Sequence, residues 1–500
     1  MDKQSKKQRK AGRVNMSKHF INPKQVFKPE RGAPMEEDSD DDVFDEDELN
    51  QEEGDLQEEE EIVEENKDME EDDGETGRVT GTKDVIEDPE EKVKVVTEAF
   101  IPGQSMAEPN EELEVSGGAY KMLHTLSLEW SCMSFDFVPD TLGALREQPP
   151  HTLYFITGSQ VETGISNKVS LVKVSSMCYT NEDEESEDED SENNELKPKI
   201  EQSCPYSDPV LVSSEAKFPA NVNRVRTLKQ KPGYAALWGD NGNIYVYDMT
   251  AHFEGVEGGI SVKGKEVKSV LHQQCEGFAL DWSSVVEGRL ISGCLNGRLS
   301  LWEYDGSEWR GSPESYLGHK KSVEDLQWSP NEADVFLSCS CDQTIRLWDA
   351  RSKERCVKSI KAHGSDVNVI NWNKLNTFQV VSGADNGELK VWDFRTFDFP
   401  IATFDWHKKA ITSVEWCPHD ETSFMASSED DTVSFWDISM EADKEAAEKY
   451  HVQEEKIPAQ LMFLHQGQKN IKEAHWHQQI KGVVATTAWD GMNVFQPCNF

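Results

Sequence analysis

The chain has 500 residues and a formal net charge of −44, and a charge of this sign repels nucleic acid and anionic membranes while it favours basic partners. No apolar run reaches the length that spans a bilayer and no secretory signal sequence is evident, so we expect neither a membrane-spanning nor a secreted chain. The ten cysteines are scattered without a C-x-x-C motif, and we expect them to be reduced thiols.

The N-terminal part of the chain consists of two oppositely charged segments. Residues 1–28 hold nine Lys or Arg against a single acidic residue, and the cluster KKQRKAGR at 6–13 is a candidate nuclear or nucleolar signal. Residues 29–110 are predicted to be an acidic, disordered region, because residues 36–75 alone carry 25 acidic side chains against one lysine. All 14 tryptophans lie beyond these segments, so the folded core is expected in the rest of the chain.

A repeat of 44 residues marks the C-terminal half of the chain. His319, His363 and His407 recur at this interval, and each is followed at fixed spacing by two tryptophans, the second of them in a Trp-Asp pair. Each copy alternates β-branched and polar residues between Asx-Gly turns, which is typical of short antiparallel strands. The period and the recurring His and Trp-Asp positions resemble WD repeats, each of which forms one four-stranded blade of a β-propeller.

The resemblance to WD repeats implies a buried structural tetrad in each blade. The tetrads that match best are His319, Ser340, Asp342 and Trp348 in one copy, and His407, Ser428, Asp430 and Trp436 in another. Other copies have Asn where Asp is usual, so their tetrads are predicted to be incomplete. Because the same residue types recur in copy after copy while an active site occurs once, we expect no enzymatic activity and no cofactor.

Three weaker copies and one degenerate blade complete the predicted fold. It is an all-β, seven-bladed WD-repeat propeller over residues 129–500, preceded by the disordered acidic tail. The chain ends too soon after the last copy to supply a fourth strand there, and an open ring would leave an exposed sheet edge. We therefore expect residues 121–128 to provide the closing strand, within a segment at 111–128 that is either an N-terminal helix or this strand.

Two acidic inserts interrupt the blades, NEDEESEDEDSENNE at 181–195 and a second one at 439–460. Each is expected to join the third and fourth strands of its blade, and all such loops emerge on one face of a propeller. The two inserts and the segment that enters the closing strand should therefore meet in one sector of that face. The inserts are either solvated loops or a polyanionic site for a basic partner, and we favour the site.

The first insert supplies most of the predicted partner-binding residues, which are Asp183, Glu184, Glu185, Glu187, Asp188, Glu189 and Asp190. Ser186, Ser191 and Ser39 lie in similarly acidic surroundings and are candidate phosphorylation sites. Phosphorylation there would deepen the same negative field.

Two stretches resemble the retinoblastoma-associated histone-binding WD proteins. They are AYKMLHTLSLEWSCMSFDFVPD at 119–140 and IPAQLMFLHQGQKNIKEAHW at 457–476. In that family an N-terminal helix and an acidic loop clamp a basic histone helix. The resemblance implies that residues 111–125, Asp443, Glu454 and Glu455 are the equivalents here, although Gly117 and Gly118 interrupt such a helix.

The wider pattern resembles the glutamate-rich WD-repeat proteins of ribosome biogenesis. It comprises the basic start, the glutamate-rich tail, and the motifs FIPG, GAYKMLH, CMSFDFV, TLYFITGSQ and ISNKVSLVKV. The resemblance implies a nucleolar protein that escorts a basic ribosomal protein of the large subunit, number three, into pre-ribosomes. We expect the chain to be a monomer. Histone binding is implied as an alternative.

Two other motifs suggest rival functions. WDAR at 348–351 and WDFR at 392–395 are WD-x-Arg motifs, which occur in substrate receptors of cullin-type ubiquitin ligases, where Arg351 and Arg395 would contact the ligase adaptor. Their arginines would otherwise pair with a carboxylate of a neighbouring blade. His475 and His477 have no third or fourth ligand at matching spacing, so we expect no metal site.

Overall fold

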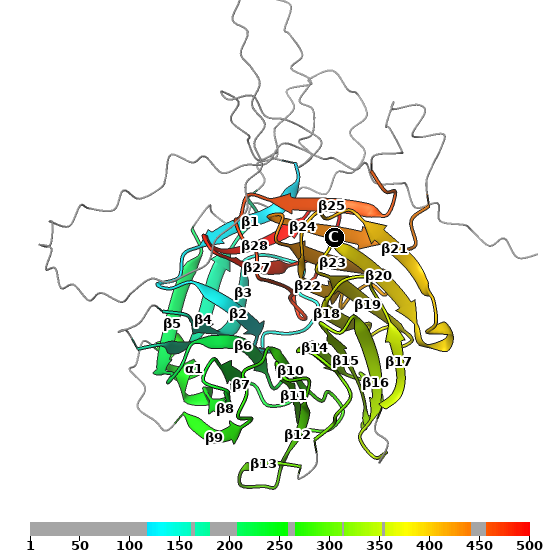
Figure 1. Ribbon diagram of the computed structural model, residues 1–500. Coiled ribbons are helices and arrows are strands. Elements are labelled where there is room, and N and C mark those ends of the chain that lie inside the picture. Colours follow the sequence, from blue (N-terminus) through cyan, green and yellow to red (C-terminus); the bar gives the residue numbers. More distant parts are fainter. Residues whose placement is uncertain are drawn as a thin grey trace, which may run out of the picture. The chain divides into compact units, whose positions relative to one another are not determined.

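The computed structural model describes residues 118–161, 166–180, 208–258, 266–312, 315–352, 356–441 and 457–500. These residues form seven four-stranded sheets, shown in Figure 1 as successive blades that follow one another in the colour order of the chain. In six of the sheets the strand order follows the sequence, and in the seventh an N-terminal strand joins three C-terminal ones. The predicted seven-bladed β-propeller is therefore confirmed.

The first four blades have the following strands. Blade one comprises β2 (Cys132–Phe137), β3 (His151–Ser159), β4 (Lys168–Met177) and β5 (Val210–Lys217). Blade two comprises β6 (Val222–Thr227), β7 (Tyr234–Gly239), β8 (Asn243–Asp248) and β9 (Val267–His272). Blade three comprises β10 (Ala279–Trp282), β11 (Leu290–Gly293), β12 (Leu299–Tyr304) and β13 (Trp309–Gly311). Blade four comprises β14 (Val323–Trp328), β15 (Val335–Ser340), β16 (Thr344–Asp349) and β17 (Cys356–Lys361).

The remaining blades have the same plan. Blade five comprises β18 (Val367–Trp372), β19 (Gln379–Ala384), β20 (Glu388–Asp393) and β21 (Pro400–Asp405), with a short 3-10 helix at Phe394–Thr396. Blade six comprises β22 (Ile411–Trp416), β23 (Ser423–Ser428), β24 (Thr432–Asp437) and β25 (Leu461–Gln466). Blade seven comprises β26 (Glu473–Trp476), β27 (Val484–Ala488), β28 (Gly491–Pro497) and β1 (Tyr120–Leu126).

The first strands of the blades form the innermost ring of the propeller. Each packs against the first strand of the next blade, and β2 of blade one contacts β26 of blade seven, so the ring is continuous. The hydrophobic core lies between blades: Leu171 of β4 and Leu237 of β7, for example, belong to one buried cluster. Burial of apolar surface between each pair of blades therefore holds the ring together.

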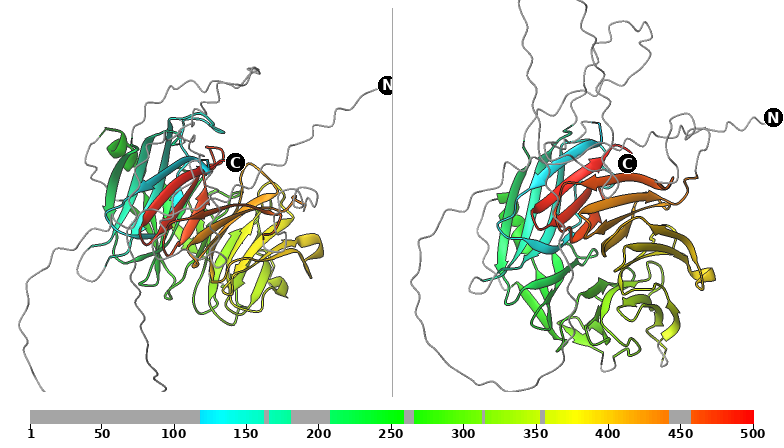
Figure 2. Two further views of the ribbon diagram at one scale, coloured as in Figure 1. Left: turned by 90° about the horizontal axis from the view of Figure 1, so that it is seen from above. Right: turned by 45° about the horizontal axis from the view of Figure 1, so that its top comes forward.

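The ring closes through β1, which pairs antiparallel with β28. Tyr120 at the start of β1 is buried against Phe463 and Phe495 in edge-to-face contacts, and its hydroxyl lies 2.7 Å from Nδ1 of His465. The predicted closing strand is confirmed (Figure 2). The alternative of a helix is wrong for residues 120–126, because the extended strand satisfies the otherwise open edge of β28; residues 111–117 lie outside the described part of the chain.

The WD tetrads differ from the prediction in their serines. In blade four, Nε1 of Trp348 and Nε2 of His319 both bond to Oγ of Ser338, at 2.8 and 2.6 Å. Nδ1 of His319 lies 3.0 Å from Asp342. The predicted Ser340 is wrong, since its hydroxyl accepts the backbone N–H of Asp342 in the adjoining turn.

The tetrad serine of blade six is likewise Ser434 and not Ser428. Oγ of Ser434 lies 2.7 Å from both Nε1 of Trp436 and Nε2 of His407, and His407 pairs with Asp430 at 2.9 Å. Blade five, predicted to be incomplete, has a full network in which Glu388 takes the place of the aspartate, 2.8 Å from His363. The histidines, tryptophans and aspartates of the two predicted tetrads are confirmed.

One α-helix joins two blades. Helix α1 (Thr250–Gly258) follows the third strand of blade two and packs on β4 and β5 of blade one. Glu257 accepts a hydrogen bond from the Tyr154 hydroxyl and pairs with Lys173 at 2.6 Å, and Ser214 of β5 bonds to His252 at 2.8 Å. The helix therefore fastens the two strands between which the first acidic insert leaves and rejoins the blade.

Eight cysteines of the described ranges are free, whereas Cys178 is disulfide-bonded. The prediction of reduced thiols is therefore wrong for Cys178. Among the described residues, no helix is long and apolar enough to cross a membrane.

Candidate functional site: the insert-bearing face

Strand direction places both acidic inserts on the same face of the propeller. Within a blade the strands are antiparallel, so loops joining first to second strands and loops joining third to fourth strands emerge on one side. The first insert lies between β4 and β5, and the second lies between β24 and β25. We call this side the insert-bearing face; the other side carries the second-to-third turns and the loops between blades.

The chain leaves blade one for the first insert beside the closing strand. The backbone N–H of Thr180 donates to the carbonyl of Lys121 at 3.0 Å, and the Thr180 hydroxyl accepts the N–H of Leu123 at 3.0 Å. Nε2 of His124 lies 3.0 Å from the carbonyl of Cys178. The last described residues before the insert are thus tied to β1.

The second insert leads into β25, whose Phe463 contacts Tyr120 of β1. Gln460 donates to the carbonyl of Met440 at 3.0 Å across the gap where the insert begins and ends. Asn499 donates to Met462 of β25 at 2.8 Å, and Nζ of Lys121 in β1 donates to the carbonyl of Phe500 at 2.6 Å. Figure 1 shows β25, β28 and β1 side by side.

The two inserts are therefore attached to one sector of the insert-bearing face, on either side of β1, as the strand order predicts. The acidic residues themselves lie outside the described part of the chain, as does the tail. This applies to Asp183, Glu184, Glu185, Glu187, Asp188, Glu189, Asp190, Asp443, Glu454 and Glu455, and to Ser39, Ser186 and Ser191. Their roles stay predictions.

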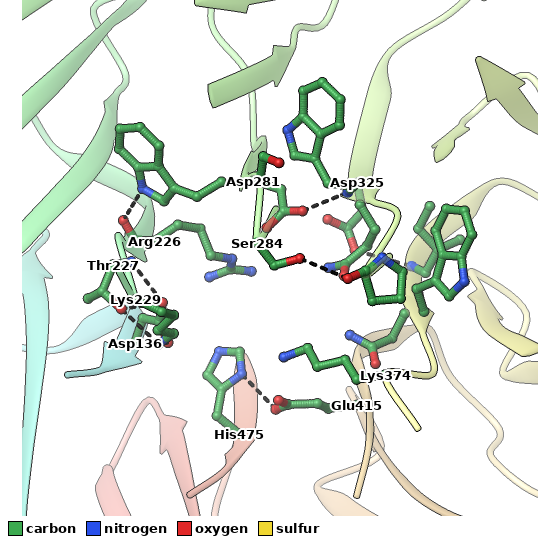
Figure 3. Close-up of a pocket in the computed structure, with 18 of the residues that line it drawn as sticks. Asp136, Arg226, Thr227, Lys229, Asp281, Ser284, Asp325, Lys374, Glu415 and His475 are labelled. Atoms are coloured by element: carbon green, nitrogen blue, oxygen red, sulfur yellow. Dashed lines mark hydrogen bonds and ion pairs between the residues drawn. The ribbon is translucent and has the colours of Figure 1, made fainter. Parts of the chain in front are cut away.

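A polar channel opens on the insert-bearing face at the propeller axis. Its cavity measures about 340 Å³ and is lined by residues from all seven first strands or the loops that follow them. Figure 3 shows Arg226, Asp281, Lys374 and His475 pointing into it from different blades. Alternating residues of a strand face opposite sides, which is why the first strands place polar or charged residues on the axis and apolar ones between blades.

Glu473 is a buried anion that contacts Arg224 and Arg226 of the channel wall. Its carboxylate is 2% exposed, pairs with Arg224, lies 3.2 Å from Nη1 of Arg226, and accepts the N–H of Phe135 at 3.1 Å. Burial alone would raise the pKa of Glu473, but the charges of Arg226 and Arg224 outweigh it and hold the pKa well below its ordinary value. Blades seven, one and two are thereby joined by one buried charge.

His475 is a cation at neutral pH. Its two ring nitrogens lie 3.0 Å from Glu415 and 3.3 Å from Glu473. Burial alone would lower the pKa of His475, but the hydrogen bonds to Glu415 and Glu473 raise it to about 9. His477 packs its ring on Phe137, and no group of three potential metal ligands occurs among the described residues.

The aspartates of the channel differ in the direction in which their pKa values are shifted. Burial opposes ionisation of Asp136, but Lys229 at 2.6 Å, His475 and Arg226 together outweigh it and lower the pKa of Asp136. Within the described ranges Asp281 and Asp325 accept hydrogen bonds only from backbone N–H groups, and burial raises the pKa of both, that of Asp281 to about 7. Charged side chains of both signs line the channel, and several pair with one another, which indicates a structural wall more than a ligand site.

The two WD-x-Arg arginines are exposed on the insert-bearing face. The side chain of Arg351 is 68% exposed and pairs with Asp349 of its own motif at 2.8 Å. Arg395 is 65% exposed, pairs with Asp393 at 2.5 Å, and lies 4.9 Å from the ring centre of Phe378. The closest carboxylate of each arginine belongs to its own motif, not to a neighbouring blade.

Sequence reasoning missed the Glu473 network. One pattern could have indicated it. Glu473 and His475 alternate with apolar residues in β26, and Arg224 and Arg226 flank an apolar residue in β6. Nothing in the sequence shows that strands 247 residues apart meet across the channel.

Comparisons with known proteins agree with this architecture. The family model for the histone-binding protein RBBP4, which also describes a component of the CAF1 complex, matches residues 110–178. The WD domain, G-beta repeat model matches residues 311–349, 354–393 and 399–437, which overlap blades four, five and six.

Three relatives match most of the chain. Ribosome assembly protein rrb1 of Schizosaccharomyces pombe is 34% identical over 419 residues, covering 80% of this chain and 85% of its own. Protein heat stress tolerant DWD 1 of Arabidopsis thaliana is 36% identical over 435 residues, covering 81% and 92%. Glutamate-rich WD repeat-containing protein 1 of Dictyostelium discoideum is 38% identical over 406 residues, covering 79% and 84%. The chain therefore belongs to the family of glutamate-rich WD-repeat proteins that these relatives represent.

Proposed function

We propose that this protein binds and escorts a strongly basic protein during ribosome assembly in the nucleus, without enzymatic activity of its own. The observation that supports the proposal most is the attachment of two acidic inserts to one sector of the insert-bearing face. The family relation to a ribosome assembly protein indicates the process. The specific cargo that we propose is the large-subunit ribosomal protein number three, bound by a monomer in the nucleolus.

Electrostatics explains how such a site works. A ribosomal protein away from rRNA is an uncompensated polycation, and a polyanion on a rigid propeller attracts it over about one Debye length, roughly 8 Å at physiological salt. Complementary charge raises the association rate more than the affinity. The cargo can then pass to rRNA, whose phosphates are more densely charged. The inserts would shield the cargo from other polyanions until that transfer.

The test replaces the ten carboxylates of residues 181–195 by Asn, Gln and Ser. Binding of the purified number-three ribosomal protein is measured by titration at several salt concentrations. We expect weaker binding and a shallower dependence of log K on log salt. A variant with the same residues in scrambled order keeps the charge and serves as the control, which should bind as the parent does. Equal affinity and slope for the neutralised variant would contradict the proposal.

Histone binding is the second candidate, favoured by the match of the histone-binding family model to residues 110–178. In the histone-binding family the clamp includes an N-terminal helix. In this chain residues 120–126, which overlap the equivalent segment, form a strand and not a helix. Titration with histones H3–H4 under the same conditions separates the candidates. Tighter binding of histones than of the ribosomal protein would make histones the cargo.

A receptor role in a cullin-type ubiquitin ligase is the third candidate. It is favoured by the exposure of both WD-x-Arg arginines on one face. Changing Arg351 and Arg395 to Ala should abolish capture of the ligase adaptor if this role exists, and should leave cargo binding unchanged. Capture that survives the double change would exclude the contact.

A further inference from the structure

Blade three differs from blades four and six at its tetrad positions. By the spacing of the repeat, Gln273 takes the place of the tetrad histidine and Asn296 the place of the aspartate. Nε1 of Trp302 still donates to Oγ of Ser292 at 2.9 Å, and Oγ of Ser292 donates to Oε1 of Gln273 at 3.4 Å. Blade three therefore has amides in place of the imidazole and carboxylate that join the loop before each of the other two blades to its second-to-third turn.

A pair of cysteines occupies neighbouring positions of the repeat in blade three. In blade four, Oγ of Ser340 donates to the carbonyl of Lys321 at 3.4 Å, and Ser428 makes the equivalent bond in blade six at 3.2 Å. The corresponding residues of blade three are Cys294 and Cys275. Their side chains contact each other through a hydrogen bond between the two thiols. A bond from a hydroxyl to the backbone is thus replaced by a contact between two thiols.

Backbone contacts hold the two cysteines side by side. The N–H of Leu295 donates to the carbonyl of Glu276 at 2.9 Å, and a Cβ atom at Gly277 would lie 2.9 Å from Cα of Cys294. The loop that contains Cys275, between β9 and β10, is therefore packed directly on the turn between β11 and β12 that contains Cys294. Both segments lie on the face opposite the inserts, since one joins two blades and the other joins a second strand to a third.

The two cysteines differ in how far solvent reaches them, because Cys294 is fully buried whereas Cys275 is half-buried. We propose that Cys275 and Cys294 are a modification site, at which oxidised glutathione or a similar small disulfide converts them to a reversible intramolecular disulfide. The bond joins the loop that leaves blade two to the second-to-third turn of blade three. It thereby supplies a link that the tetrad supplies in blades four and six.

The reaction is a thiol–disulfide exchange in two steps. The Cys275 thiolate attacks one sulfur of oxidised glutathione, which forms a mixed disulfide and releases one molecule of glutathione. The Cys294 thiolate then attacks the Cys275 sulfur, forms the internal disulfide and releases the second glutathione. The two protein thiols lose two electrons to the oxidant, and their protons leave on the two released thiols.

The ordinary state of the pair is the reduced one. Burial raises the pKa of the Cys275 thiol above its usual value, so little thiolate is present at neutral pH. Glutathione also keeps the thiols of cytosolic and nuclear proteins reduced. The disulfide therefore forms when the proportion of oxidised glutathione rises, and reduced glutathione reverses it.

The test treats the native full chain with oxidised glutathione, blocks the remaining thiols and identifies linked peptides by mass spectrometry. We expect a Cys275–Cys294 disulfide in the parent chain, and its loss when reduced glutathione is added. The melting temperature of the oxidised chain should lie a few degrees above that of the reduced chain, because the cross-link restricts the unfolded state. An unmodified Cys275, or a glutathione adduct that stays on Cys275 in the parent, would overturn the inference.

The variant Cys294→Ser separates the two steps. Serine is the residue at this position in blades four and six, so the variant should fold as the parent does. It should accumulate the glutathione adduct on Cys275 and show no rise in melting temperature on oxidation. A rise that persists in this variant would assign the shift to the disulfide of Cys178 and overturn the link between the blades.

The matched control is Cys356→Ser, which removes another half-buried thiol. Sγ of Cys356 lies 3.6 Å from the backbone carbonyl of Lys358. This variant should form the Cys275–Cys294 disulfide to the same extent as the parent. Loss of that disulfide in the control variant would show that the exchange does not depend on the contact between Cys275 and Cys294, and would overturn the inference.

Discussion

At the scale of single residues, the WD tetrads show how the register of a sheet selects one serine among several. Ser338 lies opposite Arg346 in the pairing of β15 and β16, within reach of the Trp348 indole, whereas Ser340 ends its strand. In blade six the matching position is Ala426, and its cross-strand partner Ser434 supplies the hydroxyl. Spacing along the sequence cannot distinguish these serines, because the selection depends on which hydroxyl reaches both the indole and the imidazole.

Replacing Ser338 by Ala should therefore destabilise the fold more than replacing Ser340 by Ala. The first change leaves the buried indole N–H of Trp348 without its acceptor and Nε2 of His319 without its donor, which costs about 1–3 kcal/mol. The second change removes a hydroxyl that serves a turn at the blade edge. Urea unfolding of the two variants checks the prediction, and equal losses would support the tetrad that we predicted from spacing.

The raised pKa of His475 predicts a loss of stability at alkaline pH. The proton is bound more tightly in the folded state, in which the pKa is about 9, than in the unfolded state, near 6.5. This contribution is complete below the unfolded value and is lost as the pH rises through about 9. His475→Gln should have a flatter stability profile between about pH 7 and 9 than the parent in urea unfolding.

At the scale of secondary-structure elements, buried charge joins strands that the sequence separates. Glu473 of β26 contacts β2 through Phe135, and β6 through Arg224 and Arg226. A buried ion pair of this kind contributes little more to stability than apolar side chains of similar volume would. The loss of one partner, however, leaves the other charges buried and uncompensated. The network therefore fixes the register of three first strands where the two ends of the propeller meet.

The change Glu473→Gln should accordingly lower the free energy of unfolding by about 3 kcal/mol or more, because two buried arginines lose their carboxylate. Glu429→Gln is the control. Glu429 pairs with Lys472 at 3.9 Å while 47% exposed, and such surface pairs contribute about 0–1 kcal/mol. Similar midpoints of urea unfolding for the two variants would show that the channel network is not important for stability.

At the scale of the whole propeller, closure depends on a strand that is remote in sequence. β1 pairs with β28, buries Tyr120 and Met122, and receives the base of the first insert through Thr180. Without β1, blade seven would have three strands and an open edge. The closing strand thus serves both the stability of the ring and the placement of the insert.

Deletion of residues 1–126 should therefore impair folding, whereas deletion of residues 1–110 should not. We expect the longer deletion to melt at a lower temperature and to aggregate through the exposed edge of β28. The shorter deletion keeps β1 and should melt as the full chain does. Thermal unfolding and size-exclusion chromatography of both chains check this, and identical behaviour would show that β1 is dispensable for closure.

The blade count, the closing strand and the common face of the inserts could be predicted from the sequence, because they follow from a repeat period and from antiparallel strand order. Local spacing carries that information. The tetrad serines and the Glu473 network could not be predicted in the same way. They depend on register and on contacts between strands far apart in the chain, such as the one between Phe135 and Glu473, which are 338 residues apart. Only the closed ring brings those residues to hydrogen-bonding distance.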